Sequence, residues 1–448
     1  MYGNSDNIVA LATLAGKSAL NVVRVSGPLC KKFFQQLTHT AASPKPNHVY
    51  PKYIYSGPKK KPFDFASLVY YRAPKSFTGE ESLEVSVHGG VLIANKLVET
   101  LVSFGARQAL PGEFSYRAFH NNKIDLLQAE SIAAIAEANN NIDSYYLLNN
   151  IKGALSKNLN IIKKDVVDLI ALGEHEVDFT EHEMSLEGYN AFNNRLCDAK
   201  NKIDNILKGS YVSTQENSGI RVVVVGLPNV GKSSIFNHIV GQSRSIVTNE
   251  KGTTRDTVEK EIYIGTTLIT LIDTAGIRTT ESRAESAGIK KTYQEITSAN
   301  IIIIADDANP EKIYNLLTPH IKNQKVLLVL NKTDLIKNLK QTKRVYNLSC
   351  KKNLGFNLFL TKLLTLCKQE VDFFNNQYLY LLNKRQKSFL QKIKKSFVLA
   401  NKEYKKSQDL SVLLSYLYLI RDQFDSLMRP GDKEEILRSI FKGFCVGK

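Results

Sequence analysis

A glycine-containing motif between two apolar segments constrains this chain most strongly. Gly226-Leu-Pro-Asn-Val-Gly-Lys-Ser233 directly follows the valine run 222–225 and opens a predicted helix over 234–240. This order of strand, loop and helix is typical of a phosphate-binding loop, whose backbone N–H groups wrap the β-phosphate of a nucleotide. Lys232 would neutralise the β- and γ-phosphate oxygens, and the Ser233 hydroxyl would ligate Mg²⁺. A chance glycine-rich turn is the alternative.

Three later motifs argue against a chance turn. Asp273-Thr-Ala-Gly276 follows the predicted strand 268–272, so its carboxylate could hold a magnesium-bound water and its glycine N–H could meet the γ-phosphate. Asn331-Lys-Thr-Asp334 follows another predicted strand, and Asp334 could accept hydrogen bonds from the N1–H and the exocyclic amine of guanine, a pair that adenine does not present. Ser349-Cys-Lys351 comes next, where backbone N–H groups could meet guanine O6. The order of these motifs predicts a GTP-binding domain.

Two further features bear on hydrolysis. Gly252-Thr-Thr-Arg-Asp256 lies between the phosphate-binding loop and Asp273, so a threonine is available as a second hydroxyl ligand of Mg²⁺ and as a sensor of the γ-phosphate. Ile277, which follows Asp-Thr-Ala-Gly, has no hydrogen-bonding group with which to orient an attacking water. Another residue must therefore orient the water if GTP is hydrolysed, and a domain that binds nucleotide without hydrolysis remains the alternative.

The periodicity of apolar residues divides the chain into segments. Residues 1–119 mix short β-rich runs with Gly and Pro and predict an α+β domain. Residues 120–217 and 372–448 carry apolar residues at helical spacing. Between them, residues 218–371 alternate apolar strands with helical segments, which indicates a parallel sheet covered on both faces. We expect an N-terminal α+β domain and a discontinuous α-helical domain with an inserted α/β P-loop domain.

The composition favours a polyanionic partner. The chain has 60 Lys and Arg against 43 Asp and Glu, a net charge of +17, although a uniform bias towards Lys, Asn and Ile would give the same charge. Residues 384–406 hold nine Lys or Arg in a predicted amphipathic helix, whose polar face could attract RNA phosphates or simply be solvated.

Five widely spaced cysteines indicate neither a disulfide framework nor a zinc site. With no leader-like start and no apolar run near the ~18 residues of a membrane span, we expect a cytoplasmic protein without a membrane segment.

Motifs outside the nucleotide-binding segment point to one family. The chain resembles the MnmE (TrmE) family of tRNA modification GTPases in Ile8–Ala10, Ser76–Glu80, Glu84–Gly90, Pro111–Phe119, Lys123–Glu130 and the closing Phe444-Cys-Val-Gly-Lys448. Together with the GTP-binding motifs, the resemblance extends from the first predicted strand to the last residue.

The resemblance implies three domains and a defined set of partners. Residues 1–119 would dimerise and bind a tetrahydrofolate derivative, in the 5,10-methylene or 5-formyl form. The inserted domain would be a GTPase, and the homodimer would join an MnmG-type FAD protein in a heterotetramer. Together they would install a carboxymethylaminomethyl-type group at C5 of the wobble uridine of tRNA. A GTPase switch of the Era or Der kind, which binds RNA in ribosome assembly, is the alternative.

The resemblance also assigns residues to the folate and the modification chemistry. Arg24, Glu84, Lys123 and Lys448 fall on the family's folate-contacting positions, where cations suit the glutamate tail and a carboxylate suits the pterin edge. Without the resemblance, Arg24 and Glu84 would be read as ordinary surface charges. Cys445 lies near the Lys448 ammonium, which could lower the pKa of the thiol enough to make it a nucleophile for C6 of uridine. A structural cysteine is the alternative.

The resemblance assigns further roles in the GTPase domain. Glu285 would orient the attacking water, although a solvated glutamate is the alternative. Asn229, with oxygens of the loop that contains Thr248, Glu250 and Thr253, would coordinate K⁺. The Mg²⁺ ligands would then be Ser233 and Thr254. The K⁺ ligands would be Asn229, Thr248, Glu250 and Thr253. The implied nucleotide site as a whole comprises Asn229, Val230, Gly231, Lys232, Ser233, Ser234, Thr248, Thr253, Thr254, Asp273, Thr274, Ala275, Gly276, Asn331, Lys332, Asp334, Ser349, Cys350 and Lys351.

Overall fold

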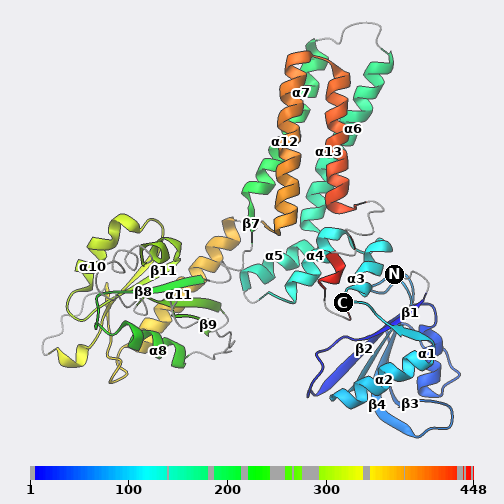
Figure 1. The fold of residues 1–448 in the computed structure, drawn as a ribbon, viewed down its shortest axis with the longest axis horizontal. Coiled ribbons are helices and arrows are strands. Elements are labelled where there is room, and N and C mark those ends of the chain that lie inside the picture. The colour runs from blue at the N-terminus through cyan, green and yellow to red at the C-terminus, as the bar shows by residue number, and fades with distance from the viewer. Residues whose placement is uncertain are drawn as a thin grey trace, which may run out of the picture. The chain divides into compact units, whose positions relative to one another are not determined.

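The computed structural model of the chain describes residues 6–138, 141–179, 186–212, 220–242, 258–264, 267–274, 292–336, 344–377, 379–430, 437, 440–444 and 447. The chain divides into two compact units (Figure 1). The first comprises residues 1–137, 147–207 and 385–448, and the second comprises 138–146 and 208–384. Helix α5 (Asn141–Ile151) spans the border between them.

The first unit begins with a mixed sheet. Its strands are β1 (Asn7–Leu11), β2 (Leu20–Ser26), β3 (Val49–Tyr55), β4 (Pro62–Tyr71), β5 (Ser82–His88) and β6 (Ala106–Gln108), in the order β3-β4-β5-β2-β1-β6. Only the β1–β6 pair is parallel among these strands. Alternate residues of β2 and β5, such as Val23, Val25, Leu83 and Val85, are buried under helices α1 (Cys30–Thr38) and α2 (Val91–Ser103). The predicted α+β domain is confirmed.

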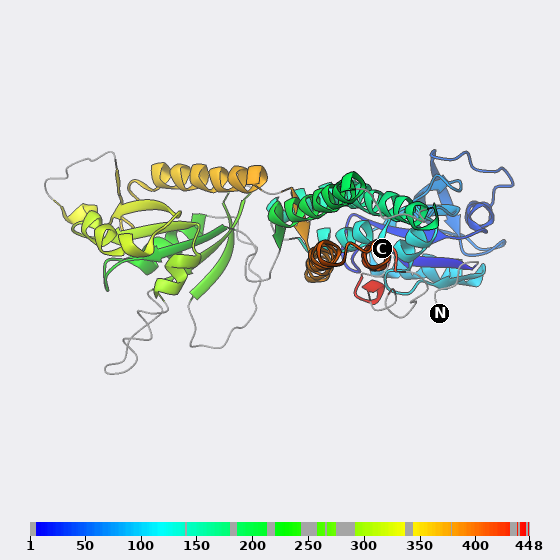
Figure 2. The same cartoon turned by 90° about the horizontal axis from the view of Figure 1, so that it is seen from above.

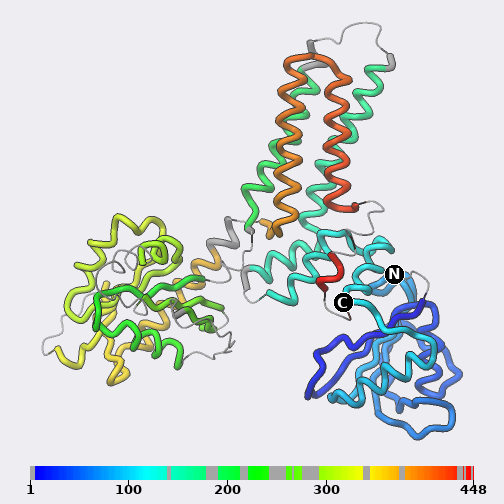
Figure 3. Tube along the Cα trace, in the orientation of Figure 1, coloured from blue at the N-terminus to red at the C-terminus, as the bar shows by residue number. Residues whose placement is uncertain are grey.

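Long helices make up the rest of the first unit. After α3 (Glu113–His120) and α4 (Leu126–Ile135), the chain forms α6 (Ala154–Phe179) and α7 (Leu186–Lys208), and much later α12 (Lys384–Ser407) and α13 (Leu410–Met428). Figure 3 shows the sequence-distant helices α6, α7, α12 and α13 running side by side. The contacts agree, since Asn401 of α12 donates to Asn193 of α7 at 3.0 Å and Lys163 of α6 pairs with Asp425 of α13. The two helical segments therefore form one discontinuous domain, as predicted.

The second unit is a doubly wound sheet. Its strands are β8 (Ile220–Val225), β9 (Val258–Ile264), β10 (Thr267–Asp273), β11 (Ile301–Asp306), β12 (Lys325–Leu330) and β13 (Val345–Asn347), in the order β13-β12-β11-β8-β10-β9. All neighbours are parallel except β9 and β10. Helices α8 (Lys232–Gln242) and α11 (Phe356–Gln377) cover one face, with α11 plainly visible along it in Figure 2. On the other face lie α10 (Pro310–Leu317) and the helical segment 292–298, so the predicted α/β fold is confirmed.

Short strands border this sheet domain where none was predicted. β7 (Ser210–Val212) lies in the expected linker, and β14 (Tyr380–Leu382) interrupts a segment expected to be wholly helical. The two strands pair in parallel, from Tyr380 with Ser210 to Leu382 with Val212. Strands of three residues are too short to show a periodic pattern in the sequence. They form because the partner strand supplies their hydrogen bonds. No helix in the described ranges combines the length and apolar character that a membrane crossing requires.

Candidate nucleotide-binding and N-terminal sites

The predicted phosphate-binding loop connects β8 to α8. Lys232, the first residue of α8, is buried, and its Nζ donates to the carbonyl oxygens of Gly226 at 2.9 Å and Leu227 at 2.6 Å. Burial lowers the pKa of Lys232, while the charge of Asp273 acts in the opposite direction. The ammonium therefore sits among backbone carbonyls and one carboxylate, in a position that phosphate oxygens could take over.

Close backbone approaches explain the glycines of this loop. A Cβ on Gly226 would lie 2.0 Å from the Ala305 carbonyl oxygen, so β8 and β11 could not stay at their observed separation. A Cβ on Gly231 would lie 2.2 Å from Nδ2 of Asn331, at a φ of +92°. Between them Asn229 has a φ of 63°, a left-handed conformation that asparagine adopts more readily than most residues, and it is exposed. Of the other predicted residues here, Val230 is buried in the loop, and Ser233 and Ser234 are exposed in the first turn of α8.

The next predicted motif ends β10, directly beside β8. Asp273 is the last residue of that strand and is only 4% exposed. Thr274 is also buried, and its hydroxyl donates to the Val224 carbonyl oxygen at 2.8 Å. Because β8 and β10 are parallel, both motifs emerge at the same edge of the sheet.

The predicted guanine motif follows β12. Asp334 lies in the short η4 helix (Thr333–Leu335) and accepts a hydrogen bond from the Ser349 hydroxyl at 2.7 Å. This bond, with smaller contributions from Lys352 and Lys351, holds the pKa of Asp334 below its ordinary value. The bond also orients the carboxylate, whose oxygens are the acceptors that guanine requires. Sequence reasoning gave Ser349 only a backbone contact, because nothing in the sequence shows that its hydroxyl reaches Asp334.

Asn331 joins the guanine motif to the phosphate-binding loop. Its buried Nδ2 donates to the Val230 carbonyl oxygen at 2.9 Å, and Cys350 Sγ donates to its Oδ1 at 3.5 Å. Burial raises the pKa of the Cys350 thiol, so this cysteine remains a neutral packing group. The neighbouring Lys332 pairs with Asp307 at 2.8 Å. The three motifs therefore form one connected edge of the sheet, with Lys351 exposed beside it.

Several predicted site residues lie outside the described residues. In the sheet domain these are Thr248, Glu250, Thr253, Thr254, Ala275, Gly276 and Glu285, and at the C-terminus they are Cys445 and Lys448. Their predicted roles stay predictions.

Two of the predicted N-terminal residues, Arg24 and Glu84, form a polar cluster with the backbone of Gly447. Arg24 and Glu84 are cross-strand neighbours on β2 and β5, and their side chains pair at 2.9 Å while each is about a quarter exposed. Arg24 also donates to the Gly447 carbonyl oxygen at 3.3 Å, which brings the C-terminal motif to this strand. Lys123 Nζ donates to the Pro74 carbonyl oxygen at 3.0 Å. Arg24 and Glu84 are therefore paired with each other and are not free surface charges.

Aromatic side chains surround this cluster, and sequence reasoning did not assign them. The Arg24 guanidinium lies 5.9 Å from the ring centroids of both Phe77 and Phe114, and the Tyr71 hydroxyl donates to Glu84 at 3.4 Å. Burial, followed by the charge of Glu84, raises the pKa of Tyr71. Phe77 lies within Ser76–Glu80, one of the segments that carry the family resemblance, and this was the signal by which the sequence could have pointed to it.

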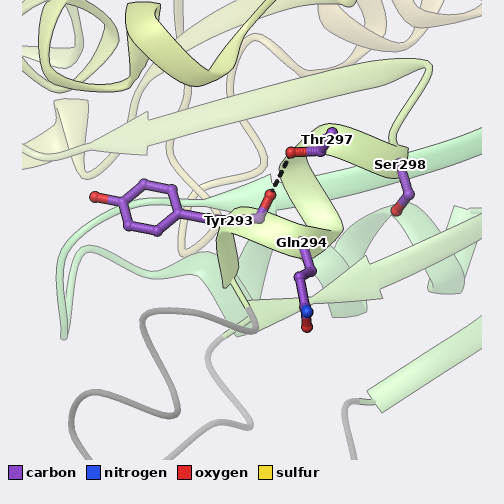
Figure 4. Close-up of a pocket in the computed structure, with 4 residues that line it drawn as sticks. All are labelled: Tyr293, Gln294, Thr297 and Ser298. Atoms are coloured by element: carbon purple, nitrogen blue, oxygen red, sulfur yellow. Dashed lines mark hydrogen bonds between the residues drawn. The ribbon is translucent and has the colours of Figure 1, made fainter.

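Figure 4 shows a separate surface hollow in the sheet domain, lined by Tyr293, Gln294, Thr297 and Ser298. The Thr297 hydroxyl donates to the Tyr293 carbonyl oxygen at 2.7 Å, within the same helical segment. The four lining residues carry no charge, so this hollow lacks the cations that a phosphate site needs.

A phosphate-binding loop, a buried aspartate and a guanine-type aspartate at one edge of a doubly wound sheet define the class of P-loop guanine-nucleotide-binding proteins. Comparison with known proteins narrows the class. Residues 7–123 match the family described as the GTP-binding protein TrmE N-terminus, and residues 126–445 match the MnmE helical domain. The chain belongs to the MnmE (TrmE) family of tRNA modification GTPases.

Full-length relatives agree with this assignment. The tRNA modification GTPase MnmE of Aliarcobacter butzleri is 34% identical, with 100% of both chains covered. That of Thermotoga maritima is 32% identical over 99% of this chain and 100% of the relative. Among solved structures, the G domain of the T. maritima FeoB iron transporter covers 33% of this chain and 98% of its own, with 26% identity and a TM-score of 0.26.

Proposed function

We propose that this chain is a GTPase, stimulated by potassium and activated by dimerisation, that acts in tRNA modification in the cytoplasm. With an MnmG-type FAD protein, in a heterotetramer, it would install a carboxymethylaminomethyl-type group at C5 of the wobble uridine. The convergence of Lys232, Asp273 and Asp334 on one sheet edge carries the nucleotide part of this proposal. Family membership supports the tRNA part.

The proposal divides the chain by task. Residues 1–119 would dimerise and bind the folate, residues 120–217 and 372–448 would form the helical domain, and residues 218–371 would be the G domain. The Era or Der alternative lacks support, because the N-terminal match over residues 7–123 is to TrmE.

The residues of the sheet edge suit GTP in distinct ways. Lys232 would exchange the carbonyl oxygens of Gly226 and Leu227 for phosphate oxygens, whose negative charge would offset the effect of burial on its pKa. Asp334, held by the hydrogen bond from Ser349, would accept the two donors of guanine. Asn331 would hold these two regions at a fixed spacing through its bond to Val230.

The donor atoms also fit the two implied cations. Ser233 and Asp273 offer hydroxyl and carboxylate oxygens, which are hard ligands suited to Mg²⁺, and the exposed Asn229 offers an amide oxygen for K⁺. Thr254 would complete the magnesium set, and Thr248, Glu250 and Thr253 the potassium set. When bound, these cations would supply positive charge against the phosphate oxygens. Ras-like GTPases orient the attacking water with a glutamine, and this chain has Ile277 at that position. Glu285 would orient the water here.

The N-terminal cluster suits a flat, negatively charged ligand. Arg24 and Lys123 provide cations, Phe77 and Phe114 provide apolar ring faces, and Glu84 provides an acceptor for ring N–H groups. These are the chemical features of a tetrahydrofolate, which would supply the one-carbon unit in its 5,10-methylene or 5-formyl form. Lys448 and Cys445 would join this site through the C-terminal segment, whose Gly447 already contacts Arg24.

The proposal is tested by steady-state GTP hydrolysis in K⁺ and in Na⁺ at several protein concentrations. We expect K⁺ to stimulate hydrolysis, the stimulation to rise with concentration, and Asn229→Ala to abolish it. Leu227→Ala is the matched control, because Leu227 is an exposed residue of the same loop whose side chain is assigned no contact with nucleotide or cation. Equal wild-type rates in both salts would refute the potassium-stimulated mechanism.

A further inference from the structure

The exposed side of α12 carries a row of lysines. The lysine row consists of Lys387, Lys392, Lys395, Lys402, Lys405 and Lys406, all exposed. At 3.6 residues per turn and 1.5 Å per residue, these six positions fall within an arc of about 140° and span about 28 Å. The opposite side of the helix, with Leu390, Ile393 and Phe397, is buried. The lysines therefore face solvent on one side of the helix, with the exposed Val398 and Leu399 between Lys395 and Lys402.

The charge of the chain is concentrated on this helix. Among its 24 residues α12 has nine Lys or Arg and a single acid, Glu403, in a chain whose net charge is +17. A uniform compositional bias would spread the excess over all 448 residues. It cannot account for a helix that supplies nearly half of the net charge.

Ion pairing separates the lysine row from Arg385 and Lys394 of the same helix. Arg385 pairs with Glu130 at 2.6 Å, and Lys394 pairs with Asp204 of α7 at 2.5 Å. Within the described ranges, no ion pair includes a lysine of the row. Two cations of α12 thus hold the bundle together, and the row presents uncompensated positive charge.

We infer that the lysine row binds the phosphate backbone of a folded RNA, which under the proposed function is tRNA. Only the identification of this RNA as tRNA rests on the proposed function. Lysines on one side of a helix over about 28 Å suit a polyanion whose charges repeat along a backbone. Such contacts position an RNA without reading its sequence.

Two other polyanions fit the lysine row less well. A membrane-surface helix buries its apolar side in lipid, whereas the apolar side of α12 is packed inside the bundle. Unpaired bases need aromatic platforms, but the aromatic residue nearest the row, Phe389, is half-buried with Arg385 and Lys392 over its ring. An acidic protein surface is the remaining rival, and the experiment includes it.

The test uses the full-length protein and a folded tRNA transcript, with affinity measured by fluorescence anisotropy across a range of salt concentrations. The variant is Lys387→Gln, Lys395→Gln and Lys402→Gln together. Each lost phosphate contact lowers the slope of log affinity against log salt by about 0.9, so three contacts lower it by about 2.7. Between about 50 and 200 mM salt, the wild type should therefore lose about 40-fold more affinity than the variant does.

Two matched variants separate the lysine row from net charge and from misfolding. Lys152→Gln, Lys157→Gln and Lys164→Gln remove the same charge from exposed positions elsewhere in the first unit and should leave the slope unchanged. Lys387→Arg, Lys395→Arg and Lys402→Arg keep the charge and should bind as the wild type does. Circular dichroism and GTP hydrolysis should match the wild type in all three variants, since none alters the nucleotide site.

Four results would overturn the inference. The first is an unchanged salt slope in the Gln variant of the lysine row, and the second is an equal fall in slope in the control triple. The third is that the wild type binds phosphatidylglycerol vesicles and the Gln variant of the row does not. The fourth is that the Gln variant of the row loses binding to an MnmG-type protein and keeps its binding to tRNA. Failure of the proposed function looks different, because GTP hydrolysis would then lack K⁺ stimulation while tRNA binding still depended on the row.

Discussion

Replacing Gly231 by Ala should disable nucleotide binding by separating the phosphate-binding loop from the guanine motif. The added Cβ would lie 2.2 Å from Asn331 Nδ2, an approach that non-bonded atoms do not make. The same nitrogen donates to the Val230 carbonyl oxygen at 2.9 Å in buried surroundings. The methyl group and this hydrogen bond cannot coexist, so Asn331 must move.

Two costs follow from the geometry. A non-glycine residue at a φ of +92° is strained by about 1–3 kcal/mol. Leaving a buried polar group without its partner costs about 1–3 kcal/mol more. If both costs fall on the binding-competent conformation, about 2–6 kcal/mol is lost, which weakens nucleotide affinity by about 30-fold to 20,000-fold.

The assay is titration with a fluorescent GDP analogue, accompanied by thermal unfolding. Gly241→Ala is the matched control, because Gly241 lies exposed in α8 with nothing within 4 Å of an added Cβ. That control should keep its affinity and gain up to about 1 kcal/mol of helix stability. In the Asn331→Ala background, the further loss from Gly231→Ala should shrink to the backbone strain alone. Affinity of Gly231→Ala within threefold of wild type, or an equal loss in both backgrounds, would refute the reasoning.

Two further outcomes follow from the structure, for Asp334 and Asp6, and two from the roles that the family resemblance implies, for Glu285 and Lys448. Asp334→Asn should relax the preference for guanine towards xanthine nucleotides, and an unchanged preference in competition binding would contradict the guanine assignment. Glu285→Ala should depress the hydrolysis rate with GTP affinity nearly intact, so a wild-type rate would move that role to another residue. Deleting Lys448 should weaken folate binding, and calorimetry showing no loss would detach the C-terminus from the cluster. For Asp6, burial alone would raise the pKa, but hydrogen bonds from Arg107 and Arg117 outweigh it and hold the pKa below the ordinary value. A depressed pKa stabilises the fold above the unfolded-state value of about 3.9 and loses this effect as pH falls through the native value, so Asp6→Asn should flatten the decrease in Tm below about pH 4. An equally steep decrease in Asp6→Asn would contradict this.

Much of the sheet domain could be predicted because its signals are local. Apolar runs such as 301–305 and 326–330 became β11 and β12, since a strand buried on both faces needs a continuous apolar sequence. Parallel strands place the residues after them at one edge, so the order of the motifs sufficed to predict a site that contains Lys232 and Asp334. Helical spacing likewise predicted that α12 has one buried side.

The contacts that complete each site depended on tertiary packing. The bond from Ser349 to Asp334 and the bond from Asn331 to Val230 connect residues whose types are common and whose sequence separations carry no signal. Arg24 meets Gly447 across 423 positions, a contact that exists only because the end of the chain returns to β2. The sequence by itself determined the motifs, the sidedness of the helices and the class of the fold, because these rest on periodicity and local hydrogen bonding. Tertiary structure decided which charges pair and which remain free, because pairing depends on the close approach of distant segments.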